Sequence, residues 1–203
     1  YNDVLNFLNE ALRICNIYSS EDNPIDLLSF ILEGKGAYFT KIGELDSARF
    51  NLYKSLEIHS KHFPDDRQMI SKILESIGDM YKNFRLFDSA LYYTQKALIK
   101  LIPEFDDLDY RINRILNFDE NLPDLIQIMA LKAEILQAIY ASEPSNIDPL
   151  VEALKIYDQL DHLSNGVKNS DLAEESKLFI ISDFHQIYNN QKCQLFLIFF
   201  CFH

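Results

Sequence analysis

The sequence predicts an all-α fold in which antiparallel helix pairs stack into an α-solenoid. Its 203 residues include only 5 Gly and 6 Pro, so few residues are available to end helices or to form turns. Apolar residues recur at a spacing of about 3.6, the period of an amphipathic helix. Small and aromatic residues also recur at a fixed offset of 42 positions. One such unit cannot bury its own apolar face, so we expect neighbouring units to stack on it.

The first half of the chain contains five predicted helices. Residues 1–18 form the first helix, with Cys15 on its apolar stripe, and the segment 19–24 breaks it. Two helix pairs follow, at 25–42 with 45–62 and at 67–83 with about 86–102. Their ends are predicted from Gly43, from the segment HFPDD at 62–66 and from Pro103.

The two pairs share a pattern of small and aromatic residues. The positions that correspond at the offset of 42 are Gly36 with Gly78, Phe39 with Tyr81, Ala48 with Ala90, and Ser55 with Ala97. Where two antiparallel helices cross, a small residue lets the backbone of the other helix approach closely. We therefore expect these small residues to lie at the crossings within each pair.

The second half follows the same plan less regularly. Residues 104–123 show no clean period and are predicted to be mostly an insertion, with part of 110–116 extending a helix. Helices are expected at 124–140, at 150–163 with Asn165 and Gly166 as its end, and at 170–190. The expected domains are a solenoid over 1–190 and an apolar tail over 191–203. Residues 195–202 of that tail either pack on the last helices or are the ragged end of a truncated or disrupted gene.

The order of small and aromatic residues resembles that of a known family. The pattern L-x-x-x-G-x-x-Y, then A, A and P, resembles the tetratricopeptide repeat (TPR), as seen at Leu74, Gly78, Tyr81, Ala90, Ala97 and Pro103. The resemblance implies a right-handed solenoid that acts as a protein-binding scaffold. The period of 42 exceeds the 34 residues of that repeat, so the helix ends or turns between repeats would be longer here.

A second resemblance covers roughly Leu27 to Tyr188. Residues 150–157, 174–179 and 187–188 resemble the TPR region that precedes the CHAT peptidase domain, a caspase-like cysteine peptidase of bacteria. In that family the catalytic residues lie in a domain after the repeats, and only 13 residues follow Asn190 here. The resemblance therefore implies no catalytic residue in this sequence, and its alternative function is a regulatory fragment without a catalytic domain.

Composition narrows the classes of partner. The net charge of −12 disfavours nucleic acid and anionic membrane surfaces, because like charges repel. The longest apolar run, 195–202, is too short to cross a bilayer as a helix.

Three cysteines without a C-x-x-C motif, and no visible signal peptide, favour a reducing cytoplasm. The chain begins at Tyr1 in helical register, so we expect it to be a piece of a longer protein.

Several residues could in principle perform chemistry. His59 and His62 have a spacing that could hold a metal, but we expect a solvated helix end or favourable charge at the helix C-terminus. The thiols of Cys15, Cys193 and Cys201 could be nucleophiles beside His185 or His203, but we expect structural thiols. The carboxylate pairs 106–107 and 174–175 are predicted to be solvated or capping. We therefore expect neither an enzyme nor a bound cofactor or metal.

The preferred candidate is a groove lined by the first helix of each pair. In TPR arrays the residues three before, and one and four after, the small position point into this groove. The corresponding residues here, with a nearby lysine, are Glu33, Ala37, Thr40, Lys72, Glu75, Asp79, Lys82, Ala130, Glu134 and Gln137. This acidic set favours a basic or amphipathic peptide, or an adjacent domain of the same parent protein. The alternative is that these residues are merely exposed.

Overall fold

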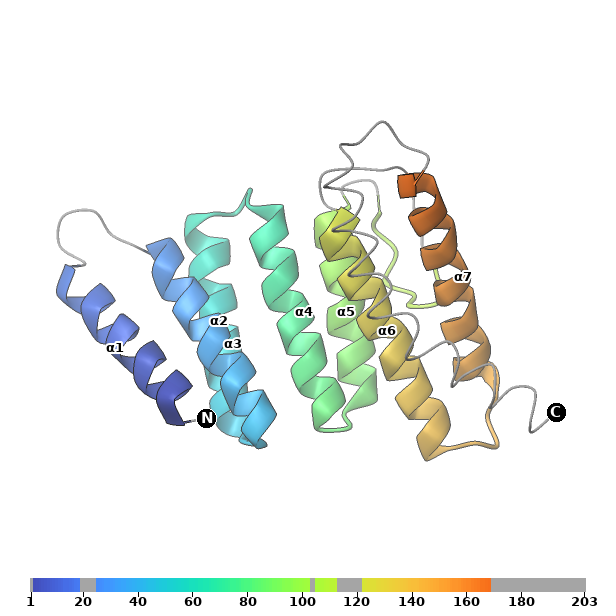
Figure 1. Cartoon of the computed structure of the whole chain (residues 1–203), viewed down its shortest axis with the longest axis horizontal. Helices are drawn as coiled ribbons and strands as arrows, with labels where there is room; N and C mark the ends of the chain where they lie inside the picture. The colour runs from blue at the N-terminus through green and yellow to red at the C-terminus, as the bar shows by residue number, and fades with distance from the viewer. Residues whose placement is uncertain (1, 19–24, 103–104, 113–121, 169–203) are drawn as a thin grey trace. The chain divides into compact units, whose positions relative to one another are not determined.

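The computed structural model describes residues 2–18, 25–102, 105–112 and 122–168 (Figure 1). These described residues form helices joined by turns and short irregular segments, without a strand, so the predicted all-α class is confirmed. The chain divides into two compact units, Tyr1–Leu108 and Asp109–His203. The predicted helix at 170–190, the tail at 191–203 and most of the insertion at 104–123 lie outside the described residues.

The first unit consists of one leading helix and two antiparallel helix pairs. Its helices are α1 (Asn2–Tyr18), α2 (Ile25–Ile42), α3 (Leu45–His62), α4 (Arg67–Asn83) and α5 (Phe87–Leu101). Helix α2 pairs with α3 and α4 pairs with α5, while α1 packs on α2, α3 packs on α4, and α2 also meets α4. The predicted bounds of α2, α3 and α4 agree with these, because Gly43 and the segment around Pro64 interrupt the apolar periodicity sharply.

Small residues lie where the helices of each pair cross, as the sequence predicts. A Cβ atom added to Gly36 would lie 2.4 Å from Cγ of Leu52 on α3. A Cβ atom added to Gly78 would lie 2.6 Å from Oγ1 of Thr94 on α5. Ala48, like its counterpart in the second pair, has no exposed surface. The two crossings therefore use corresponding positions, 42 residues apart, and leave no room for a larger residue.

The turns inside the two pairs also correspond. Gly43 follows α2 with φ +82°, and Arg85 follows α4 with φ 58°. In each turn the next residue donates to a helical carbonyl: Glu44 N to Phe39 O and Leu86 N to Tyr81 O, both at 2.9 Å. A left-handed residue after a helix is a common way to satisfy its last carbonyl groups. Glycine adopts this conformation freely, whereas arginine at the same place is strained.

Three tyrosines connect the two pairs of the first unit. The hydroxyl of Tyr53 on α3 lies 3.0 Å from that of Tyr81 on α4 and donates to that of Tyr93 on α5 at 2.5 Å. The rings of Tyr81 and Tyr93 are stacked, with their centroids 5.5 Å apart. Burial, followed by hydrogen bonding to the two other phenols, raises the pKa of Tyr53. Tyr53 therefore remains neutral at physiological pH, and the three hydroxyls form a hydrogen-bonded link between the pairs.

The second unit contains the pair α6 (Leu122–Ser142) and α7 (Asp148–Lys168), which pack together. Ala133 and Ala153 are both fully buried, as expected for small residues at a crossing. Helix α7 begins before the predicted position 150 and continues through Asn165 and Gly166, so the prediction that these two residues end the helix is wrong. Isolated residues of low helix propensity are tolerated near a helix end when the preceding turns are well packed.

Helix α6 is the one helix within the described residues that is long and apolar enough to cross a membrane. Its apolar window is 56% buried inside the protein, and the core helix of a soluble protein has the same length and composition. We therefore interpret its hydrophobicity as core packing in the second unit.

Candidate functional site

Most of the predicted groove residues of the first unit share one surface, the α2/α4 face, defined here as Glu33, Ala37, Lys72, Glu75, Asp79 and Lys82. At 3.6 residues per turn, the members from each helix lie on one side of that helix. Lys72 is exposed and the other members are half-buried. The hydroxyl of Ser76 on α4 donates a hydrogen bond of 2.6 Å to Oε1 of Glu33 on α2. This bond joins the two first helices directly, so their side chains form one continuous surface.

Carboxylates dominate the α2/α4 face. Asp79 pairs with Lys82 at 2.9 Å between Oδ1 and Nζ, and Glu75 is also engaged in an interaction. The carboxylate of Glu33 accepts a hydrogen bond from a neutral hydroxyl, which leaves its charge uncompensated by that partner. Three carboxylates against two lysines give the face a net negative formal charge. Such a surface can attract a cationic segment.

Thr40 does not belong to this face, although the sequence predicts it there. It is 6% exposed, and its Oγ1 donates a hydrogen bond of 2.9 Å to the carbonyl oxygen of Gly36. With Leu32 and Gly36 it forms a stripe at a spacing of four residues on the buried side of α2. The analogous prediction for Ala130 on α6 is wrong for the same reason, because Ala130 is 3% exposed.

The remaining predicted groove residues, Glu134 and Gln137, lie on α6 in the second unit. Both are half-buried. Gln137 donates a hydrogen bond of 2.6 Å from Nε2 to the hydroxyl of Tyr157 on α7, and burial is the main cause that raises the pKa of this tyrosine. Gln137 therefore has a structural role in the α6–α7 pair.

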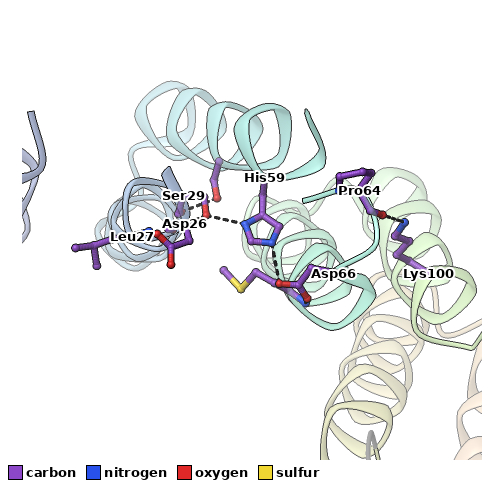
Figure 2. A network of polar contacts seen from close by, with 9 residues as sticks. Asp26, Leu27, Ser29, His59, Pro64, Asp66 and Lys100 are labelled. Atoms are coloured by element: carbon purple, nitrogen blue, oxygen red, sulfur yellow. Dashed lines mark hydrogen bonds and ion pairs between the residues drawn. The ribbon is translucent and has the colours of Figure 1, made fainter. Parts of the chain in front are cut away.

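A buried polar network lies where α2, α3 and the start of α4 meet (Figure 2). His59 is 1% exposed, so the prediction of a solvated helix end is wrong for this residue. Its Nδ1 lies 2.8 Å from Oγ of Ser29, and its Nε2 lies 3.0 Å from Oδ2 of Asp66. Asp66 also caps α4, because its Oδ1 accepts a hydrogen bond from Met69 N. His59 continues the buried stripe of α3 through Leu52 and Ser55, which is the sequence signal that could have placed it.

The Ser29–His59–Asp66 network has the residue types of a hydrolytic triad, but its serine is not accessible to a substrate. Ser29 has no exposed surface, and its hydroxyl donates a hydrogen bond of 2.7 Å to the carbonyl oxygen of Asp26. A nucleophilic serine must present its oxygen to a substrate. We therefore assign the network a structural role in joining three helices. The described residues contain no group of three or more potential metal ligands, and His62 is exposed.

Of the other candidate nucleophiles and carboxylates, only some lie within the described residues. Cys15 is a free thiol with 4% of its surface exposed, in agreement with the predicted structural role. Asp106 is exposed, in agreement with a solvated carboxylate, whereas Asp107 is half-buried. The remaining candidates lie outside the described residues: Cys193, Cys201, His185, His203, Glu174 and Glu175.

Sequence reasoning missed Lys132, which has no exposed surface on α6. Burial lowers the pKa of its amine to about 7, against the opposing effect of the negative charges of Asp109 and Glu152. Hydrogen bonds from Arg111 lower the pKa of Asp109 to about 2, so this opposing charge persists at neutral pH. An amine with such a pKa can act as a nucleophile, but here no substrate can reach it. Its position on the stripe of Leu125, Met129 and Leu136 predicts its burial.

Comparisons with known proteins give no match to a protein-family model, to a curated protein or to a solved structure.

Proposed function

We propose that this protein is an interaction module whose α2/α4 face binds a basic or amphipathic peptide segment, or an adjacent domain of its own parent protein. The single observation that carries the proposal is the direct contact between the first helices of consecutive pairs, through Ser76 and Glu33. The proposal includes a TPR-like α-solenoid, which is supported by the corresponding crossings and turns of the two pairs and by the packing of α3 on α4.

The charge on the α2/α4 face supports a cationic partner. A peptide carrying lysine or arginine would meet Glu33, Glu75 and Asp79, and the overall charge of −12 would favour its approach. The half-buried state of these side chains limits the conformational entropy that they lose on binding. An acidic peptide would meet repulsion from the same three groups.

The resemblance to the region preceding a caspase-like peptidase does not yield a second proposal. The residues at 174–179 and 187–188, on which it partly depends, lie outside the described residues.

The proposal can be tested without knowing the natural partner. Random peptides of about 15 residues would be selected on the whole chain, and the affinity of an enriched peptide measured by fluorescence anisotropy. We expect basic peptides, and about tenfold weaker binding to the Glu75→Lys/Asp79→Lys variant, because two attractive charges become repulsive.

A matched control reverses two exposed carboxylates elsewhere, in Glu57→Lys/Glu143→Lys. This variant has the same net charge as the test variant and should bind the peptide nearly as tightly as the unaltered chain. Enrichment of acidic peptides, enrichment of none, or equal losses in the two variants would contradict the proposal.

A further inference from the structure

A cavity of about 620 Å³ lies in the first unit, on the side of α4 away from the α2/α4 face. Its α4 lining residues, Arg67, Ile70 and Leu74, lie on a different side of α4 from Asp79, and Ile70 lies directly opposite Asp79 when α4 is viewed along its axis. The other walls come from α3, α5 and the segment 105–108. Its volume is in the range of sites that bind small molecules, roughly 300–1,000 Å³.

The charged residues of this cavity are mainly cationic, in contrast to the acidic chain. Arg67, Lys96 and Lys100 line it, with Asp106 as the one carboxylate among its lining residues. The amine of Lys100 is held in place by a hydrogen bond of 3.0 Å to the carbonyl oxygen of Pro64 (Figure 2). Lys96 lies over the ring of Tyr92, with Nζ 5.3 Å from the centroid. Among the described residues, none of these three cations forms an ion pair.

The rest of the cavity is largely apolar and one wall is firmly fixed. Ile70, Leu74 and Phe105 are at most 5% exposed and supply its apolar surface. The segment carrying Phe105 is anchored to α5, because Nε2 of Gln95 donates a hydrogen bond of 2.7 Å to the carbonyl oxygen of Asp107. Gln95 has no exposed surface, so this anchor is protected from water.

We propose that this basic cavity binds a small anionic amphiphile, with a carboxylate or phosphate head and an apolar chain. The head would accept hydrogen bonds from Arg67, Lys96 and Lys100, which are charge-assisted and therefore strong. The chain would pack against Leu74 and Phe105, where apolar area removed from water contributes to affinity. The α2/α4 face is a separate surface, so this binding is independent of the proposed peptide binding.

The probes are decanoate and decyl phosphate, titrated below their micelle concentrations into the whole chain by calorimetry. Decanol and decyltrimethylammonium test the head group, and inorganic phosphate tests the head without the chain. We expect both anionic amphiphiles to bind at least about tenfold more tightly than the neutral and cationic ones, and inorganic phosphate not to bind measurably. A preference for decanoate over decyl phosphate, or the reverse, identifies the natural head group.

Two variants connect the binding to the cavity. Arg67→Gln/Lys96→Gln should weaken decanoate binding at least about tenfold, while Lys41→Gln/Lys61→Gln removes two exposed charges elsewhere and should not. Ser60→Phe should abolish binding by filling the space, with circular dichroism to verify folding. Binding of decanol as tight as that of decanoate, no binding of either anion, or equal effects of the two double variants would overturn the proposal.

Discussion

The hydroxyl of Ser71 on α4 donates a hydrogen bond of 2.8 Å to the carbonyl oxygen of Ala97 on α5. In the preceding pair the corresponding bond runs the other way, from the hydroxyl of Ser55 on α3 to the carbonyl oxygen of Ser29 on α2, at 2.7 Å. At the offset of 42, Ser29 corresponds to Ser71 and Ser55 corresponds to Ala97. A serine at either of the two positions can therefore supply the hydroxyl that links the helices of a pair. Each pair is thus held by a buried bond between its two helices.

Loss of this bond should be measurable in Ser71→Ala. We expect the free energy of unfolding to fall by about 1 kcal/mol, the usual net contribution of a buried hydrogen bond. Urea denaturation followed by circular dichroism would measure it. Ser89→Ala is the control, because Ser89 lies on α5 without such a bond to a described residue, and its stability should change little. Equal effects of the two substitutions would show that the bond contributes nothing.

Close packing at the helix crossing predicts opposite effects for two glycine substitutions. Gly78→Ala would place a Cβ atom 2.6 Å from Oγ1 of Thr94 and 3.4 Å from the backbone of Ala90 and Thr94, so we expect a destabilisation of about 1–3 kcal/mol. Gly34→Ala meets only Cδ2 of Leu8, at 3.4 Å. There the higher helix propensity of alanine should stabilise by about 0.5–1 kcal/mol. Thermal unfolding of both variants would test the difference in sign.

The strained turn after α4 predicts a stabilising substitution. Arg85→Gly would relieve the positive φ of 58° at a position where the preceding pair already has glycine. We expect a gain of about 0.5–1 kcal/mol in unfolding free energy, reduced from the full cost of a left-handed residue by the lost contact of the guanidinium with the Phe87 ring. Gly43→Ala should destabilise the other turn. A lower unfolding midpoint for Arg85→Gly would contradict this account.

Burial of Lys132 predicts a pH-dependent stability. In the unfolded chain its pKa returns to 10.5, and in the folded protein it is about 7. Between these values the unfolded state binds more protons, so this residue makes stability rise with pH, by up to about 1.4 kcal/mol per unit. Below pH 7 both states are charged and the slope disappears.

The substitution Lys132→Met removes this titration and introduces an apolar side chain of similar length. We expect the variant to be more stable than the unaltered protein at pH 7, with the difference in urea midpoint shrinking towards pH 10. Lys155→Met, at an exposed position of α7, is the control and should show no such convergence. A constant difference between Lys132→Met and the unaltered protein across this range would disprove the effect.

Helix positions were predictable from the sequence because local chemistry determines them. Gly43 and Pro64 interrupt a clear apolar period, which fixes the end of α2, both ends of α3 and the start of α4. The end of α7 was not predictable from Asn165 and Gly166, because low propensity alone does not end a helix whose preceding turns are packed.

The candidate sites were less predictable, because polar residues on buried stripes were assigned by residue type. Thr40 and His59 look like surface residues, yet each lies on the buried side of its helix. Lys132 is hidden in the same way. The basic cavity depends on Arg67 and Lys96, which come together through packing of α4 and α5 and share no local pattern. The buried stripe of each helix, traced along the sequence, would identify Thr40, His59 and Lys132 as buried. The cavity can be identified only from the tertiary structure.

The common register of the two pairs has a consequence for the length of this protein. Removal of residues 44–85 would place Gly43 directly before Leu86 and leave Gly36 of α2 opposite Thr94 of α5. The first unit of the shortened chain would then retain one complete pair, with its left-handed turn provided by glycine. In the solenoid proposed above, one pair could be gained or lost at a time without a new core, so the area of the proposed binding surface would change in whole steps.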